Sequence, residues 1–266
     1  MRHRRRFLLG AATLSALIWV RMHQETRTAE PWPGVKPTRI LIVEEQALFA
    51  SMLAELLRAH SGFTVVASVG TFAAAENALE NRKIDLVVVN LTLPDRSGLE
   101  LIAALGERKH SARIVVCTAV EHPSAVVTAF GLGAHAFVER SSGLPELVAT
   151  LRRVARGEHC LGPRVAKVLR DHASGREETG ILQATDLTVL RRLASREAVR
   201  DIAASLNLSA SGIYKVRHRI ARATGARTKR DFHRAALSLG LVSGDPGSAE
   251  VNGQDPADAG ENDAGP

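Results

Sequence analysis

Four apolar runs of the sequence end in polar side chains that could meet in one place. Glu44 and Glu45 follow the run RILIV, Asn90 follows IDLVVV, Thr118 follows ARIVVC and Arg140 follows AHAFVE. Continuous apolar runs are typical of buried parallel strands, and ligand sites lie at the carboxyl ends of such strands. We therefore expect a shared crevice, in which the fork of Arg140 pairs bidentately with Glu44 or Glu45. In the alternative, Arg140 points to solvent.

A second set of candidate residues lies on a helix that we expect to begin after Ser209, a favoured N-terminal cap. Ile213, Val216 and Ile220 form its apolar stripe. A short helix, a tight turn and a basic second helix can place that second helix in the major groove of DNA. Its remaining faces carry the candidate DNA contacts Tyr214, Lys215, Arg217, His218, Arg219 and Arg222.

The charge distribution favours the same partner. Residues 181–242 contain twelve Lys or Arg and four Asp or Glu, a local charge of +8, and the whole chain has a net charge of +7. A basic segment of this kind suits a polyanion such as double-stranded DNA. In the alternative, the charges form a solvated surface and the helical segment does not bind DNA.

Composition predicts a soluble globular protein with two ordinary domains. The chain has 266 residues, of which 45% are hydrophobic and 24% are charged. Its two cysteines, Cys117 and Cys160, offer neither a disulfide framework nor metal-ligand spacing. We therefore expect a reducing, cytoplasmic location.

Strand and helix patterns alternate from Arg39 onward and would position the crevice. Five apolar runs are each followed by a helix-length amphipathic stretch, which predicts five βα units over residues 38–158. This alternation is typical of an α/β doubly wound domain with a five-stranded parallel sheet. The predicted helices are Ala47–His60, Phe72–Glu80, Leu99–Glu107, Ser124–Gly131 and Leu144–Ala155.

An all-α domain of four helices is predicted over residues 181–242. It follows a linker at 159–180 that contains one expected helix, Val165–His172. Apolar residues recur at helical spacing in each segment of the domain, so each helix can lay one stripe on a core. The predicted helices are Leu182–Leu193, Val199–Leu206, the basic helix after Ser209, and about Lys229–Leu239.

The two ends are predicted to lie outside both domains. In residues 1–37 a basic start precedes the apolar run Phe7–Val20, which resembles a leader sequence but is too short for a stable membrane span. We interpret it as a peripheral extension, and Met22 or Val35 could be nearer the true start. Residues 243–266 contain six Asp or Glu and no Lys or Arg, so we expect disorder. This segment either solubilises the protein or competes with DNA for the basic domain.

Residues 38–158 resemble the receiver domains of two-component response regulators. The resemblance lies in the runs ILIVEEQALF, DLVVVNLTLPDRSGLELI and GAHAFVER. It implies a flavodoxin-like strand order, 2-1-3-4-5. It also implies two acids for Mg²⁺ at Glu44 and Glu45, a phosphate-accepting aspartate at position 90, a lysine at position 140, and a hydroxyl-aromatic switch pair at Thr118 and Phe137.

Two positions depart from the receiver pattern, Asn90 and Arg140. An amide is neutral and poorly nucleophilic, so no ordinary acyl phosphate can form on Asn90. The loss of that charge and the longer glutamates predict weak or absent Mg²⁺ binding and no cofactor. We expect Thr118 and Phe137 to be packing residues. A phospho-accepting role for Thr92, Asp95 or Glu45 is disfavoured, because none stands at the family's acceptor position.

Residues 182–242 resemble the LuxR-type helix-turn-helix of NarL/FixJ response regulators. The resemblance lies in the runs LTVLRRLAS, RDIAASLNLSASGIYKVRHRIAR and TGARTKRDFHRAA. It implies base contacts by Tyr214, Lys215 and His218, and charge makes the three arginines of this helix candidates for phosphate contacts. It also implies a homodimer formed through the last helix, with a stripe such as Phe232, Ala236 and Leu239.

Gly212 and the pair Ala223-Thr224 depart from the LuxR-type pattern. Glycine in a helix lowers its stability by about 1 kcal/mol relative to alanine, which predicts a less rigid reading helix.

The sequence therefore predicts a DNA-binding transcriptional regulator that is not an enzyme and does not depend on aspartyl phosphorylation. The alternative is a pseudo-receiver that docks a histidine kinase or another regulator and has little specific DNA binding.

Overall fold

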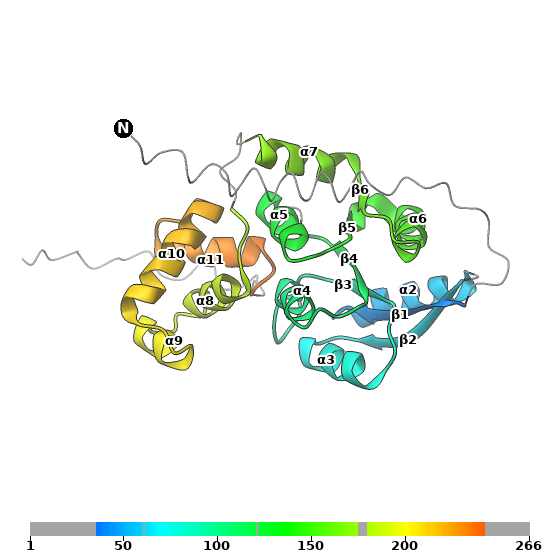
Figure 1. Ribbon diagram of the computed structural model, residues 1–266, viewed down its shortest axis with the longest axis horizontal. Helices are drawn as coiled ribbons and strands as arrows, with labels where there is room; N and C mark the ends of the chain where they lie inside the picture. Colours follow the sequence, from blue (N-terminus) through cyan, green and yellow to red (C-terminus); the bar gives the residue numbers. More distant parts are fainter. Residues whose placement is uncertain (1–35, 61, 121, 175–179, 243–266) are drawn as a thin grey trace, which may run out of the picture.

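The computed structural model describes residues 36–60, 62–120, 122–174 and 180–242. It shows an α/β domain joined to a group of four helices (Figure 1). The predicted extension and acidic tail lie outside the described residues. Within the described ranges, no helix is long and apolar enough to cross a membrane.

A six-stranded parallel sheet forms the centre of the α/β domain. Its order is β2-β1-β3-β4-β5-β6, which confirms the predicted order of the first five strands and adds one at the edge. The apolar runs form these strands because parallel strands are covered by helices on both faces. The strands are β1 (Thr38–Val43), β2 (Phe63–Val69), β3 (Leu86–Val89), β4 (Arg113–Thr118), β5 (Ala136–Glu139) and β6 (Cys160–Leu161).

The α/β domain has three layers, with the sheet in the middle and helices on both of its faces. Alternate strand residues point to opposite faces, so Ile40 and Val88 belong to one buried cluster and Leu41 and Val89 to the other. The first cluster packs under α2 (Ala47–Ala59) and α6 (Gly143–Ala155). The second packs under α3 (Phe72–Asn81), α4 (Gly98–Glu107) and α5 (Pro123–Gly131). All five helices lie within one residue of their predicted bounds.

The predicted linker is in part a sixth strand and helix of the sheet. Cys160 and Leu161 pair with β5 as β6, and α7 (Pro163–Ala173) packs back against α5 (Figure 1). The expected five-stranded sheet and the linker at 159–180 are corrected accordingly. A two-residue strand leaves no apolar run in the sequence, so pattern alone predicted only the helix.

The C-terminal domain has the four predicted helices. They are α8 (Ala184–Ala194), α9 (Val199–Ser205), α10 (Ala210–Thr224) and α11 (Lys229–Ser238). The side chain of Ser209 caps α10 by accepting from the Gly212 backbone N–H at 3.1 Å, as predicted. Gly225 ends the helix in the left-handed conformation.

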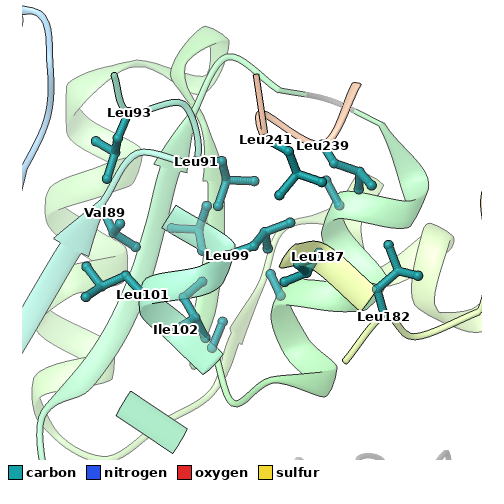
Figure 2. Close-up of a cluster of buried hydrophobic side chains, with 14 of the residues drawn as sticks. Val89, Leu91, Leu93, Leu99, Leu101, Ile102, Leu182, Leu187, Leu239 and Leu241 are labelled. Carbon is teal, nitrogen blue, oxygen red and sulfur yellow. The ribbon is translucent and has the colours of Figure 1, made fainter. Parts of the chain in front are cut away.

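The two domains share one buried apolar cluster, which the sequence analysis did not predict. Figure 2 shows Leu91 and Leu99 of the α/β domain beside Leu187, Leu239 and Leu241 of the helical domain. In α4 and α5 nearly every side chain is buried, because the sheet lies on one side and the helical domain or α7 on the other.

Polar contacts fix the position of this interface. Ser124 Oγ of α5 donates to the carbonyl of Ala223 at the end of α10 at 3.1 Å. The backbone N–H of Leu182 lies 3.4 Å from Thr128 Oγ1. A buried carboxylate of α4, Glu100, lies 3.3 Å from Arg191 Nε of α8. The structure therefore joins the two domains through a packed surface.

A methyl group at Gly240 is expected to loosen this interface. Gly240 has φ +67°, and a Cβ there would lie 3.1 Å from the backbone carbon of Leu91 and 3.2 Å from its oxygen. We expect Gly240→Ala to lower the free energy of unfolding by about 2 kcal/mol, from the left-handed backbone and the crowding together. Gly225→Ala is the matched control, because φ is +73° there and no atom would lie within 4 Å. Urea unfolding of both variants separates the effect of crowding from the effect of the left-handed backbone. Equal decreases in the free energy of unfolding would contradict the predicted contact at Gly240.

Candidate functional sites: a polar crevice and a basic helix

The polar crevice forms at the carboxyl ends of β1, β3, β4 and β5, as the sequence predicted. Asn90 lies directly after β3 and is only 4% exposed. Its Nδ2 donates to Glu45 Oε2 at 2.6 Å and to the carbonyl of Thr92 at 3.0 Å. Its Oδ1 is buried and has no hydrogen-bond partner among the described residues. The amide therefore ties Glu45 to the loop after β3.

Arg140 and Glu44 form the predicted ion pair across the crevice. The contact joins Arg140 Nη2 to Glu44 Oε2, and the guanidinium lies 4.4 Å from the ring centre of Phe49. Within the described residues Arg140 Nε has no partner, so the contact is not the bidentate one expected. The side chains are 17% and 3% exposed, which places a fixed positive charge inside the crevice.

Burial shifts the proton equilibrium of Glu44. Loss of solvent raises the pKa of this carboxyl group from 4.5 to about 7, although the backbone N–H of Gln46 and the charge of Arg140 both act to lower it. Oε1 of Glu44 accepts from Gln46 N–H at 2.9 Å. The ionised form of Glu44 is therefore held by two contacts at an unfavourable, buried position.

The basic helix α10 is anchored by the predicted stripe. Ile213, Val216 and Ile220 are buried against the rest of the helical domain. On the opposite side Tyr214 is 61% exposed, and Lys215, His218 and Arg222 are exposed as well. We call the side formed by Tyr214, Lys215, His218 and Arg222 the reading face of α10. The exposure of these four side chains shows that the receiver-like domain does not cover this face, and its hydrogen bond to α10 lies at the end near Ala223.

Arg219 and Arg217 have contacts within the chain. Arg219 Nε donates to Asp186 Oδ1 at 3.0 Å, and Asp186 is fully buried at the start of α8. Asp186 also caps α8 by accepting from the Gln183 N–H at 3.0 Å. The guanidinium of Arg217 lies 5.4 Å from the Phe232 ring centre. Arg219 therefore holds α10 against α8. The sequence predicted a phosphate contact for it, because all three arginines of α10 lie off the apolar stripe.

The stripe predicted to form a dimer is buried within the chain. Phe232 is 5% exposed, and Ala236 and Leu239 are fully buried. Phe232 packs in the helical domain, and Leu239 lies in the interface with the α/β domain (Figure 2). In this arrangement the stripe is not available to a second copy, so its expected role is corrected. The apolar spacing correctly predicted that these residues are buried. Spacing alone does not indicate which surface covers them.

A protein-family model, described as the response regulator receiver domain, matches residues 40–152. The chain carries a response regulator receiver domain. The match spans β1 to α6 and includes the whole crevice, which confirms the resemblance drawn from the strand-end residues.

The similarity to known proteins extends over both domains. The nitrate/nitrite response regulator protein NarP of Escherichia coli is 29% identical over 180 residues, which are 66% of this chain and 84% of NarP. The transcriptional regulatory protein UhpA of Salmonella typhimurium is 29% identical over 175 residues, which are 66% of this chain and 85% of UhpA. A solved structure of RcsB from Salmonella enterica serovar Typhimurium has a TM-score of 0.59 at 18% identity, covering 75% of this chain and 98% of RcsB. The likeness to RcsB shows a shared fold.

The receiver crevice does not fit Mg²⁺ in its present form. Mg²⁺ needs several oxygen ligands in near-octahedral geometry. Glu44 is paired with Arg140, Glu45 accepts from the Asn90 amide, and the guanidinium adds a positive charge at the same place. In the described part of the chain no group of three or more His, Cys, Asp or Glu could hold a metal ion. The donor set therefore disfavours a bound dication.

Thr118 and Phe137 are packed inside the receiver domain. Thr118 is fully buried and its Oγ1 accepts from the Val120 N–H at 3.2 Å. Phe137 is 2% exposed within the apolar cluster under α5. Their burial agrees with the expectation that they serve as packing residues.

Asn90→Asp is expected to make the stability of the receiver domain depend on Mg²⁺. The change removes the hydrogen bond of 2.6 Å that Asn90 donates to Glu45, and it adds a third carboxylate to the crevice. We therefore expect the free energy of unfolding to fall by about 1–3 kcal/mol near neutral pH. A dication that binds only the folded state would restore part of this lost stability. Thermal unfolding with and without MgCl₂ measures this, and the wild type should not respond. Asn77→Asp, which changes an exposed amide of α3, is the matched control. A Mg²⁺ response of the wild type would contradict the crevice chemistry.

Proposed function

We propose that this protein is a DNA-binding transcription regulator that works without aspartyl phosphorylation and without a cofactor. NarP and UhpA are described as a response regulator and a transcriptional regulatory protein, and RcsB is described bound to the promoter rprA. The observation that carries the proposal is the reading face of α10, which stays exposed while the receiver domain packs elsewhere.

Two features of the receiver domain support independence from phosphorylation. The acceptor position holds the amide of Asn90, which cannot form an acyl phosphate. Arg140 already contacts Glu44, so the crevice holds a fixed guanidinium charge at the place where a phosphorylated receiver would gain charge. In the described arrangement of the two domains the reading face of α10 is exposed without a phosphoryl group on the receiver domain. This supports DNA binding that does not require phosphorylation.

The test is selection of duplexes by the full chain from a random DNA pool at fixed salt, with no phosphodonor. A sequence motif is expected, and it should contain two half-sites where two copies of the chain bind together, because symmetric dimers read paired sites. Lys215→Ala should lower affinity for the selected site by about 5- to 100-fold if Lys215 contacts a base. Lys167→Ala on α7 is the matched control, because this exposed lysine pairs with Asp171 away from α10. Binding that is sensitive to salt and shows no sequence preference would overturn the proposal.

A docking module is the second candidate function, and one observation favours it. Leu48 and Met52, one turn apart on α2, are 79% and 48% exposed. Exposed apolar side chains beside the crevice suit contact with a histidine kinase or another regulator. If the selection yields no motif, and Leu48→Ser abolishes capture of a purified kinase, this function replaces the first.

A further inference from the structure

Most cations of the helical domain that lack acidic partners in the described structure lie on α10 or shortly after it. Of the twelve Lys and Arg in residues 181–242, five pair with Asp or Glu: Arg191, Arg192, Arg200, Arg219 and Arg234. Apart from Arg196, the cations with no ion pair among the described residues are Lys215, Arg217, Arg222, Arg227, Lys229 and Arg230. These six belong to α10, the turn after it and the first turn of α11.

The sequence supplies a matching set of acids in residues 243–266. This segment contains Asp245, Glu250, Asp255, Asp258, Glu261 and Asp263, and no Lys or Arg. It follows directly on Val242, just beyond α11. The tail therefore has six negative charges that can complement the cations around the reading face.

The length of the tail is comparable to the length of α10. A chain of 24 residues has a root-mean-square span of roughly 25–30 Å when flexible. α10 has 15 residues, about 22 Å, and both α10 and α11 pack on α8. A segment of this length that is tethered after Val242 would be present at α10 at an effective concentration in the millimolar range.

We propose that residues 243–266 dock on the reading face of α10 and its neighbouring cations, where they compete with DNA. This inference rests on the proposed function, because it assigns that face to DNA. The acids bind in place of phosphates, so weakly bound, non-specific DNA is displaced first and a site with base contacts is favoured.

The first experiment measures docking in the full chain without DNA. A nitroxide attached to Ser248→Cys in the tail should broaden the amide NMR signals of α10 and of the first turn of α11. Both native cysteines are buried, so a single added thiol can be labelled selectively. Broadening should disappear at about 0.5 M salt, where charges on the surface are screened. Broadening confined to other elements, or none at all, would overturn the proposal.

An isotope-mixing control identifies which copy supplies the tail. Labelled chain that carries no nitroxide is mixed with unlabelled chain that carries it. No broadening is expected in the mixture, because the tail belongs to the same chain as the helix. Broadening of α10 in the mixture assigns the contact to the tail of a second copy and overturns the intramolecular proposal.

The second experiment measures competition. All six acids of the tail are changed to Asn or Gln at unchanged length, and a variant with the tail sequence shuffled but its charge kept is the matched control. With millimolar effective concentration and a dissociation constant near 0.1 mM, the neutral tail should raise affinity for non-specific duplex about tenfold at about 0.1 M salt. The shuffled tail should match the wild type. Equal affinities of the neutral and wild-type tails would overturn the competition.

The two experiments separate this inference from the proposed function. If no DNA motif is selected but the nitroxide still broadens α10, the docking stands and the assignment of that face to specific DNA fails. If a motif is selected but the tail leaves α10 and non-specific affinity unchanged, the docking fails and the regulator stands.

Discussion

Arg219→Ala is expected to lower the free energy of unfolding by about 3–5 kcal/mol, more than any other change of a basic residue on α10. The reason is Asp186, which is 1% exposed and pairs with both Nε and Nη2 of Arg219. Removing the guanidinium leaves a buried carboxylate whose other contact is the Gln183 N–H. A buried charge that loses its partner costs far more than an exposed one.

Urea unfolding monitored by circular dichroism measures this effect, and Arg222→Ala is the matched control. Arg222 lies one turn further along α10, is exposed and has no acidic partner among the described residues, so its loss should change stability by less than about 0.5 kcal/mol. The double variant Arg219→Ala/Asp186→Asn should recover much of the loss, because the amide keeps a cap acceptor without the buried charge. If Arg219→Ala weakens DNA binding with no effect on stability, its assignment to phosphate contact is correct and the structural role is wrong.

Arg219 shows where sequence reasoning about the site reached its limit. On a helical projection Arg217, Arg219 and Arg222 all lie off the apolar stripe, so the pattern gives them one role. The distinguishing residue is Asp186, a carboxylate in the first turn of α8 that the structure buries completely. An acid beside a buried stripe signals a partner, but only the packing of α10 on α8 shows which arginine it is.

The receiver domain was predictable because its signal is local. Each apolar run forms a strand and each amphipathic stretch a helix, and the strand-end residues Glu44, Asn90 and Arg140 meet because parallel strands share a carboxyl edge. β6 escaped prediction because it has two residues, Cys160 and Leu161, and its place depends on pairing with β5.

The interface between the domains was not predictable from amphipathic stripes. In α5 the side chains Ala125, Val126, Val127, Ala129 and Phe130 are buried on all sides. An all-round apolar helix indicates burial on both sides, and that signal was present in the sequence. The identity of the covering surface was not, because it depends on how α8, α10 and α11 pack on the receiver domain.

The largest effect predicted for the crevice is a dependence of stability on pH that arises at Glu44. Its pKa is raised from 4.5 to about 7 in the folded protein, first by burial. A carboxyl group with a raised folded pKa stabilises the fold fully below its unfolded pKa, and this stabilisation is lost as pH rises through its folded pKa. The wild type should therefore lose up to about 3 kcal/mol from this group between about pH 4.5 and pH 7.5.

Glu44→Gln should remove this component, since an amide does not titrate, while Glu55→Gln on the exposed side of α2 should keep it. Urea unfolding across the pH range measures the difference between the variants at each pH. A Glu44→Gln variant whose stability has the same pH dependence as the wild type would show that other groups are responsible.

Arg140→Met tests the partner of the same pair, and its cost should depend on pH. Above about pH 8 Glu44 is ionised in the wild type and pairs with Arg140, so removing the guanidinium should cost about 3 kcal/mol or more. Near pH 5 Glu44 is protonated with or without Arg140, so the cost should fall below about 1 kcal/mol. The guanidinium also lies over the Phe49 ring, and the apolar methionine side chain retains packing there. An equal cost at both pH values would mean that Arg140 stabilises the crevice by packing on Phe49, and that its charge does not compensate Glu44.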